Sequence, residues 1–202
     1  MIIGVTGGTG CGKTTALEAA QALGGLVLDC DAIYHRLLAE DKALLCAIEA
    51  RFPGVVEGGV LQRKKLGEIV FSDKNALLDL NKITHAAVKQ EVLRQLQGHT
   101  GLAVIDAIGL FEGKLDSLCD VTVAVTAPEA VRVQRLVCRE GISEDYARAR
   151  IAAQRPQAEF VSLCDRTLDN SGSRDEFYAK CLAFFKPYSI MKETNFTEDE
   201  VK

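Results

Sequence analysis

The residues Gly7-Gly-Thr-Gly-Cys-Gly-Lys-Thr14 decide the fold that this sequence predicts. They match the Walker A pattern, in which four residues separate a glycine from the sequence Gly-Lys-Thr. Glycines let a backbone curve closely around phosphate groups, and the helix that follows adds the positive end of its dipole. Lys13 is then placed to reach the β- and γ-phosphates of a nucleoside triphosphate, and the Thr14 hydroxyl to bind Mg²⁺.

The residues on either side of the loop fit this interpretation. An apolar run, Met1–Thr6, precedes the loop and predicts a strand, and residues 13–23 predict a helix. The alternative, a glycine-rich turn that matches the pattern by chance, does not explain this order of strand, loop and helix. We therefore expect the triphosphate to be bound by Gly8, Gly10, Cys11, Gly12, Lys13, Thr14 and Thr15.

Short apolar runs alternate with longer helical patterns along the rest of the chain. This alternation is typical of an α/β fold in which helices cover a parallel sheet. Because the apolar runs are nearly continuous, we expect strands that are buried on both faces. The expected fold is a three-layer sandwich of the P-loop type with five strands, at Met1–Thr6, Leu26–Asp29, Leu102–Ala107, Val121–Thr126 and Thr167–Asp169, and further helices near 31–39, 41–52, 63–71, 73–97, 127–140, 143–155 and 173–186.

The segment between the second and third expected strands is much longer than one crossover requires. About 70 residues lie there, whereas a crossover helix with its loops needs far fewer. The excess predicts a helical subdomain beside the sheet, where a substrate pocket can form. We expect one domain over 1–188, with a core (1–29, 101–140 and 164–188), an inserted helical substrate subdomain (about 30–100) and a helical lid (about 139–163), followed by a polar tail over 189–202.

Composition limits the class of protein. The 202 residues suit one domain, and the net charge of -4 argues against a nucleic-acid partner. The seven cysteines are odd in number and include no Cys-x-x-Cys pair, so neither a disulfide framework nor a zinc site is expected. No stretch has the length of a membrane span, and the first residues do not form a signal sequence. We expect a monomeric, cytoplasmic protein with reduced thiols.

Two of the expected strands end in carboxylates. The last residue of the apolar run Leu102–Asp106 is placed to hold the magnesium shell through water, although a strand-end turn explains it as well. Asp29-Cys-Asp31 follows the second strand, at the edge where ligands bind to open α/β sheets. Asp31 is a candidate to orient or deprotonate a hydroxyl, or else to cap the next helix, and Asp29 and Asp31 can divide these two roles.

Arginines gather after the fourth expected strand of this acidic chain. They lie at 132, 135 and 139, and again at 148, 150 and 155. We expect a cationic lid that closes over the phosphates, excludes water and stabilises the transferred group. The alternative is a solvated helix face, which is the usual reason for such a run.

Other P-loop classes fit less well. Asp106-Ala-Ile-Gly109 imitates the Asp-x-x-Gly sequence of a GTPase, but the guanine-reading Asn-Lys-x-Asp sequence is missing. Its nearest match, Asn81-Lys-Ile-Thr84, lacks the aspartate and precedes Asp106. A Leu-Ser-Gly-Gly sequence, expected of a transport ATPase, is absent as well. Paired carboxylates and a cationic lid favour a small-molecule kinase.

Taken in order, the motifs resemble the dephospho-coenzyme A kinase family, from the first strand to about residue 186. The chain departs from the family pattern where Ile108-Gly109 replaces Pro-Leu and where Ala86 replaces a proline. The resemblance rests on Gly4–Thr15, Leu28–Asp31, Ile83-Thr-His85, Asp106 with Leu110-Phe-Glu112, Gln134–Arg139, Arg150–Gln154 and Asp169-Asn-Ser-Gly172.

The resemblance implies a reaction and a set of residues for it. The γ-phosphate of ATP, bound with Mg²⁺, would pass to the ribose 3′-hydroxyl of dephospho-coenzyme A, giving coenzyme A and ADP in the last step of that cofactor's synthesis. Asp31, Lys13 and Arg139 would be catalytic, and Arg150 would join Arg139 in binding ATP. The acceptor would be bound by Asp31, His85, Asp106, Leu110 and Glu112.

Two other functions stay open on the sequence alone. One is a kinase for another nucleoside or nucleotide, and the other is a nucleotide-binding module with slow, regulatory turnover. A separate question is the thiol of Cys11, for which a position at a helix N-terminus predicts a lowered pKa. The alternative for Cys11 is a small buried side chain without a chemical role.

Overall fold

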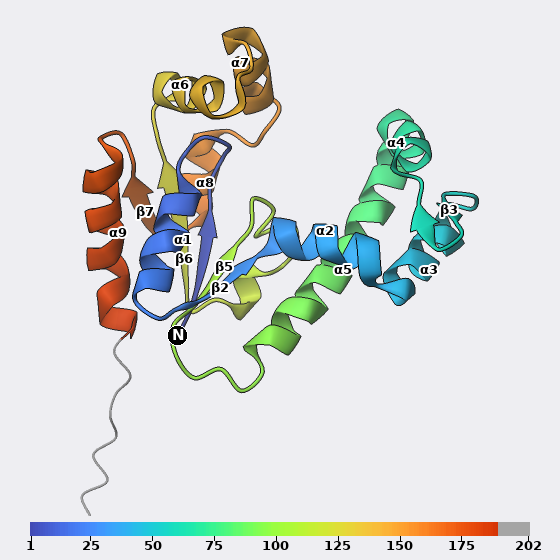
Figure 1. Cartoon of the computed structure of the whole chain (residues 1–202), viewed down its shortest axis with the longest axis horizontal. Coiled ribbons are helices and arrows are strands. Elements are labelled where there is room, and N and C mark those ends of the chain that lie inside the picture. Colours follow the sequence, from blue (N-terminus) through green and yellow to red (C-terminus); the bar gives the residue numbers. More distant parts are fainter. Residues whose placement is uncertain (190–202) are drawn as a thin grey trace, which may run out of the picture.

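Five strands form one parallel sheet in the computed structural model, which describes residues 1–189 (Figure 1). They are β1 Ile2–Thr6, β2 Leu26–Asp29, β5 Ala103–Asp106, β6 Val121–Thr126 and β7 Arg166–Asp169. Their order is β2-β5-β1-β6-β7, so that β1, which leads into the phosphate loop, lies in the centre. The predicted P-loop sandwich is thereby confirmed. Beyond Ser189, the expected polar tail lies outside the described residues.

Side chains of the sheet enter two separate cores, because successive residues of a strand point to opposite faces. On one face, Val104 packs under α1 (Lys13–Ala22) and α9 (Arg174–Ser189), which contact each other. On the other face, Ile105 packs with the loop after β5 and with the helices that follow β2. Apolar residues on both faces explain why the strands read as unbroken hydrophobic runs.

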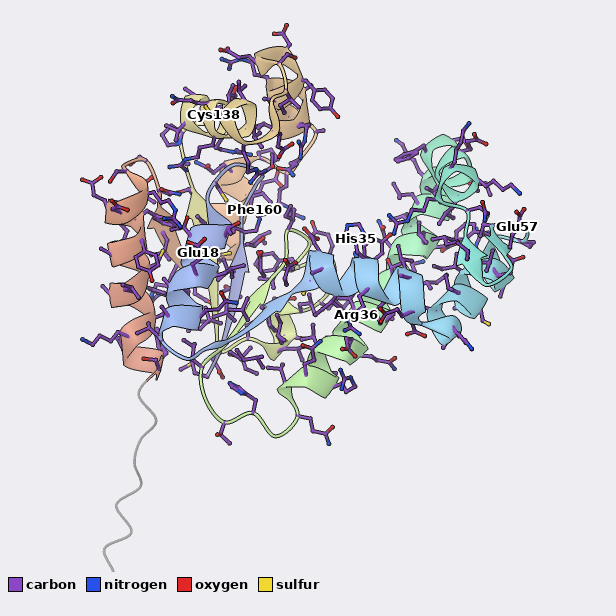
Figure 2. All side chains as sticks on the ribbon, in the orientation of Figure 1. Glu18, His35, Arg36, Glu57, Cys138 and Phe160 are labelled. Carbon is purple, nitrogen blue, oxygen red and sulfur yellow. The ribbon has the colours of Figure 1, made fainter. Side chains whose placement is uncertain are left out.

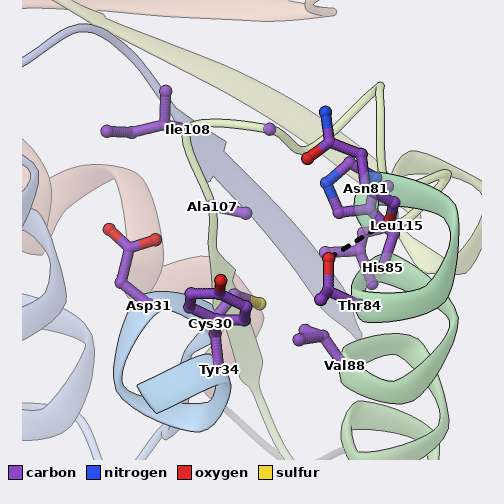
Figure 3. Close-up of a pocket in the computed structure, with 12 residues that line it drawn as sticks. Cys30, Asp31, Tyr34, Asn81, Thr84, His85, Val88, Ala107, Ile108 and Leu115 are labelled. Atoms are coloured by element: carbon purple, nitrogen blue, oxygen red, sulfur yellow. Dashed lines mark hydrogen bonds between the residues drawn. The ribbon is translucent and has the colours of Figure 1, made fainter. Parts of the chain in front are cut away.

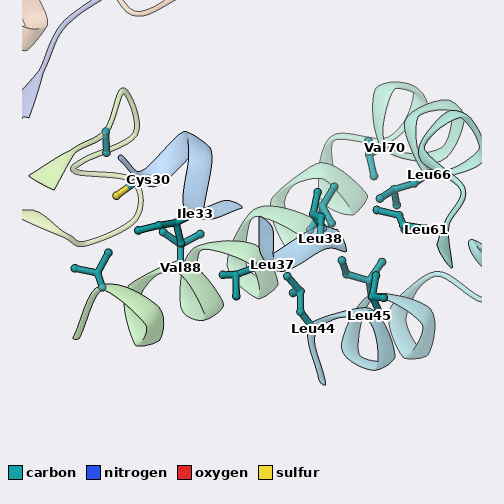
Figure 4. Close-up of a cluster of buried hydrophobic side chains, with 14 of the residues drawn as sticks. Cys30, Ile33, Leu37, Leu38, Leu44, Leu45, Leu61, Leu66, Val70 and Val88 are labelled. Atoms are coloured by element: carbon teal, nitrogen blue, oxygen red, sulfur yellow. The ribbon is translucent and has the colours of Figure 1, made fainter. Parts of the chain in front are cut away.

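A helical arm extends from the sheet between β2 and β5 (Figure 1). Leucines from its four helices fill a core that continues into the second core of the sheet (Figure 4). None of the helices within residues 1–189 is both long enough and apolar enough to cross a membrane. The arm consists of α2 Cys30–Glu40, α3 Lys42–Arg51, the hairpin β3 Val56–Glu57 and β4 Val60–Leu61, α4 Arg63–Ser72, and α5 Lys74–Leu96.

Glu91 joins α2 to α5 within this arm. Its buried carboxylate accepts hydrogen bonds from Arg36 on α2, at 2.6 Å, and from Arg94 and Gln95 on its own helix. The bond from Arg94 and those from its neighbours lower the pKa of Glu91 to about 2. Because α2 carries Asp31 and α5 carries His85, this ionic contact fixes two walls of the site relative to each other.

Two small elements are not among those expected from the sequence. The β3–β4 hairpin turns at Gly58-Gly59, whose positive φ values of 58° and 81° suit a two-residue turn. Helix α8 (Gln157–Leu163) begins after Pro156 and packs on β6 with its buried Phe160 (Figure 2). The helix expected over 143–155 is shorter and forms α7 (Glu144–Ala152).

Helices α6 (Glu129–Glu140) and α7 stand beyond the carboxyl end of the sheet (Figure 1). They pack on each other around a small separate core of Val133, Leu136, Ala147 and Ile151. Ser143 caps α7, since its hydroxyl accepts a hydrogen bond from the Tyr146 amide at 3.2 Å. Because the core between α6 and α7 is separate from the two cores of the sheet, these two helices are suited to move together as one rigid unit.

Candidate active site

The phosphate loop needs its glycines for two measurable reasons. Gly7, Gly10 and Gly12 have φ values of 143°, 76° and 98°, a region that other residues rarely adopt. A Cβ atom at Gly12 would also lie 2.1 Å from Nδ2 of Asn170, and one at Gly7 would lie 2.4 Å from the carbonyl oxygen of Val125. Helix α1 begins at Lys13 without a side-chain cap, which leaves its first amides available to an anion.

Side chains from distant elements hold the outer side of this loop. Asn170, which follows β7, donates from Nδ2 to the Cys11 carbonyl at 2.8 Å. Arg135 on α6 donates to the side-chain oxygen of Asn170 at 3.0 Å. The buried Arg132, also on α6, donates from Nε to the Thr9 carbonyl at 2.9 Å. Two of the six arginines gathered after β6 therefore contact the loop directly.

Lys13 and Asp106 meet at the inner side of the loop. The Lys13 ammonium donates to the Gly7 carbonyl at 3.2 Å and lies 4.0 Å from Oδ1 of Asp106. This oxygen is buried and has no hydrogen-bond partner among the described residues. Burial raises the pKa of Asp106 to about 6, with Lys13 opposing the shift and Asp29 and Asp31 adding to it. An unpaired, partly desolvated carboxylate beside a phosphate loop is a suitable neighbour for a hydrated cation.

The raised pKa of Asp106 predicts a pH-dependent stability. Between about pH 4 and pH 6 the carboxyl ionises in the unfolded chain before it ionises in the folded one, so the wild type loses stability as pH rises. Asp106→Asn lacks this loss. As pH rises from about 4 to about 7, its free energy of unfolding should therefore increase by about 2–3 kcal/mol relative to that of the wild type. Urea unfolding in buffer without Mg²⁺ or nucleotide measures the difference, and a difference that is constant with pH would contradict the prediction.

The two carboxylates after β2 have different environments. Asp29 is the N-cap of α2, because its side chain accepts a hydrogen bond from the Ala32 amide at 2.9 Å. It also lies opposite Asp106 in the register of β2 and β5. Asp31, in the first turn of α2, makes no such cap and faces a cavity (Figure 3). Of the two alternatives drawn from the sequence, capping therefore falls to Asp29.

The cavity measures about 280 Å³ and lies between α2, α5 and the loop 107–115, which we call the acceptor loop (Figure 3). His85 projects into it from α5, as the sequence predicted for the acceptor side. Asn81 and Val88 lie on the same face of α5, one turn before and one turn after it, a spacing that helical periodicity could have revealed. The lining consists of Cys30, Asp31, Tyr34, Asn81, Thr84, His85, Val88, Ala107, Ile108, Gly109, Gly113 and Leu115.

The other acceptor residues expected from the sequence do not line this cavity; they are Asp106, Leu110 and Glu112. Leu110 is fully buried and anchors the acceptor loop in the core. The exposed Glu112 forms an ion pair with Arg155, which lies between α7 and α8. Leu110 and Glu112 therefore belong to the acceptor loop itself: Leu110 holds it in the core, and Glu112 pairs it with Arg155.

A second groove lies on the other side of the phosphate loop, with a volume of about 520 Å³. The sequence predicted Thr14, Thr15 and Arg139 for the nucleotide, and all three line this groove. Glu18 of α1 and Cys138 of α6 border it as well (Figure 2). A cavity on one side and a groove on the other place the phosphate loop between two ligand-sized spaces.

Arg139 and Arg150, the two lid arginines expected at the nucleotide, share one partner. Each forms an ion pair with a different oxygen of Glu140, the last residue of α6. The hydrogen bond from Arg139, followed by that from Arg150, lowers the pKa of Glu140. Both cations are thus paired with the same carboxylate in this structure.

The expectation of a lowered pKa for the Cys11 thiol is wrong. The side chain is 1% exposed, and burial raises its pKa although Lys13 and Arg132 act in the opposite direction. The thiol packs in the hydrophobic core and lies near Gly7, where an added Cβ would be 3.0 Å from its sulfur. Cys11 therefore fits the alternative of a small buried side chain, and only its backbone can face a phosphate.

Comparisons with known proteins agree with this geometry. A sequence model described as "Dephospho-CoA kinase" matches residues 1–176. Dephospho-CoA kinase of Carboxydothermus hydrogenoformans is 39% identical over 178 residues, which cover 85% of this chain and 86% of that one. The enzyme of Syntrophotalea carbinolica is 36% identical over 182 residues, covering 87% and 86%. The solved dephospho-CoA kinase of Campylobacter jejuni has a TM-score of 0.66 at 27% identity, covering 93% and 96%. The chain therefore belongs to the dephospho-CoA kinase family.

Proposed function

We propose that this chain transfers the γ-phosphate of ATP to the ribose 3′-hydroxyl of dephospho-coenzyme A, giving coenzyme A and ADP. The observation that carries this proposal is the position of Asp31. Its carboxylate faces a cavity on the acceptor side of the phosphate loop, while Asp29 caps the same helix in its place. A carboxylate that does not cap the helix and that faces such a cavity is suited to receive a proton from an acceptor hydroxyl.

The bond changes follow from this placement. Asp31 accepts the proton of the 3′-hydroxyl while the oxygen of this hydroxyl forms a bond to the γ-phosphorus. The bond between that phosphorus and the β,γ-bridging oxygen breaks, and ADP leaves with this electron pair. Lys13, the amides at the start of α1 and the arginines Arg139 and Arg150 stabilise the charge on the transferred group.

Residues of the phosphate loop also fit Mg²⁺. This ion prefers oxygen ligands, keeps several waters and needs only one or two protein groups beside the phosphates. The Thr14 hydroxyl would bind it directly, and Asp106 would hold it through water, in keeping with the unpaired buried oxygen of Asp106. Within residues 1–189, no three His, Cys, Asp or Glu side chains form a metal cluster. When bound, Mg²⁺ neutralises charge on the β- and γ-phosphates.

On the acceptor side, His85 is proposed to contact the nucleoside part of dephospho-coenzyme A, and Asp106, Leu110 and Glu112 to shape the loop that faces it. The seven thiols are all free, which supports the cytoplasm as the site of the reaction. We propose that the enzyme acts as a monomer, because donor groove, phosphate loop and acceptor cavity all lie within one chain.

The experiment that tests the function measures ADP release with ATP and Mg²⁺ in the presence of different acceptors. Dephospho-coenzyme A is expected to support turnover, whereas adenosine, AMP and pantothenate are not. If another of these acceptors were preferred, the protein would be a kinase with a different substrate, and the proposed function would be wrong. Binding of ATP without turnover on any acceptor would favour the regulatory module that the sequence left open.

A further inference from the structure

Two consecutive residues of the expected lid contact two loops that are far apart in the sequence. Gln154 accepts a hydrogen bond at Oε1 from the Thr9 amide of the phosphate loop, at 2.7 Å. The next residue, Arg155, forms an ion pair with Glu112 at the tip of the acceptor loop. Two consecutive side chains thus connect the lid to the donor side and to the acceptor side of the site.

The donor end of this connection is held from both sides. The Thr9 carbonyl accepts a hydrogen bond from Arg132 of α6, the helix that leads into the lid, and the Thr9 amide donates to Gln154, which lies within the lid. A Cβ atom at Gly8 would lie 2.4 Å from Arg132 Nη2 and 3.1 Å from Gln154 Oε1, so the fit leaves no space for a side chain. A displacement of the lid therefore acts on this segment and on the phosphate loop together.

The acceptor end is a loop with its own internal bonds. The Gly113 amide donates to the Gly109 carbonyl and the Leu115 amide to the Leu110 carbonyl, both at 2.9 Å. Ala107 and Gly109 of this loop form one wall of the acceptor cavity. A loop that is closed by such bonds transmits a pull at its tip to the cavity wall, and Glu112 is the residue at which the lid holds it.

We propose that Arg155 is a positioning residue which, through Glu112, couples closure of the lid over the triphosphate to the shape of the acceptor cavity. Binding of ATP then strengthens binding of dephospho-coenzyme A, and by linkage the reverse holds by the same factor. Arg155 touches neither substrate and acts through the acceptor loop. This inference rests on the proposed function, because it concerns the same two substrates.

The size of the coupling follows from the exposure of the pair. The side chains of Arg155 and Glu112 are 28% and 43% exposed, so the ion pair is partly screened by solvent. Exposed pairs contribute up to about 1 kcal/mol, which corresponds to a factor of about five in a binding constant. Removing the pair should therefore reduce the coupling factor by up to about fivefold and leave the affinity for ATP alone unchanged.

The test measures by calorimetry the Kd of dephospho-coenzyme A with and without the Mg²⁺ complex of a non-hydrolysable ATP analogue. The ratio of the two values is the coupling factor. Arg155→Ala and Glu112→Ala should each reduce it, and the double variant should reduce it no further than Arg155→Ala alone. The exchange Glu112→Arg with Arg155→Glu should restore part of the factor, which a merely structural role would not do.

The ion pair of Arg51 with Asp79 supplies a matched control, since it joins α3 to α5 with an Nε–Oδ2 distance of 2.9 Å and similar exposure. Arg51→Ala should leave the coupling factor unchanged. A coupling factor of one in the wild type would overturn this inference but not the proposed function. The same holds if Arg155→Ala and Glu112→Ala reduced the coupling factor independently of each other. Failure of the wild type to bind dephospho-coenzyme A at all would overturn the proposed function with it.

Discussion

An Asp31→Asn enzyme is expected to lose about three orders of magnitude in kcat, within the range of 10²–10⁴ that a positioned general base contributes. Asparagine keeps the size and the hydrogen-bonding capacity of the side chain but cannot accept the proton of the hydroxyl. The KM values for ATP and dephospho-coenzyme A should change little, because the acceptor is still oriented. Steady-state ADP release, with both substrates varied, measures the loss.

Asp29→Asn is the matched control for Asp31→Asn. Asparagine caps helices about as well as aspartate, so α2 should keep its start and the protein its stability. We expect its kcat to stay within about tenfold of wild type, since Asp29 is engaged with the Ala32 amide. If Asp29→Asn lost more activity than Asp31→Asn, the roles assigned to the two carboxylates would have to be exchanged.

The second large effect is expected of Lys13→Met, with a loss of about 10²–10³ in kcat, as is typical when one preorganised charge-stabilising donor is removed. Methionine fills the space of the lysine stem and leaves the phosphates without the ammonium group. Lys82→Met is the control, because Lys82 is exposed on α5 and pairs only with Asp79 among the described residues.

Lys13→Met has a second readout that does not depend on turnover. Lys13 is the group that lowers the pKa of Asp106 against the effect of burial. Its removal should move that pKa further above its value of about 6, which an NMR titration of the carboxyl carbon follows. Loss of activity with an unmoved pKa would mean that Lys13 does not lie beside Asp106 in solution.

The phosphate loop could be predicted from sequence because its structure is local. Eight consecutive residues specify it, and positive φ values at Gly7, Gly10 and Gly12 demand glycine in any surroundings. The five strands were also predictable, since burial on both faces leaves a continuous apolar run. The family resemblance pointed to His85, which lines the cavity together with Asp31, and its contact with the acceptor stays a prediction.

Other features depend on tertiary contacts that no local pattern contains. Asp29 and Asp31 both lie at the start of a helix, and only the path of the chain decides which one reaches the Ala32 amide. Of the two alternatives for Cys11, the lowered pKa of the thiol followed from its position at a helix N-terminus, whereas burial in the folded chain raises that pKa and favours the small buried side chain. Which arginines contact the phosphate loop is likewise set by how α6 packs, and Arg132 and Arg135 do so in this structure.

The carboxylate of Glu140, shared by two arginines of the lid, changes what an ATP affinity measures. A triphosphate that recruits Arg139 and Arg150 does not meet bare cations but exchanges places with an anion that already holds them. The net gain in binding free energy is the difference between the contacts of the arginines with the triphosphate and their contacts with Glu140. It is therefore smaller than the number of arginines suggests. Before ATP binds, Glu140 also offsets part of the positive charge of the two arginines, which limits their attraction for unrelated anions in a crowded cell.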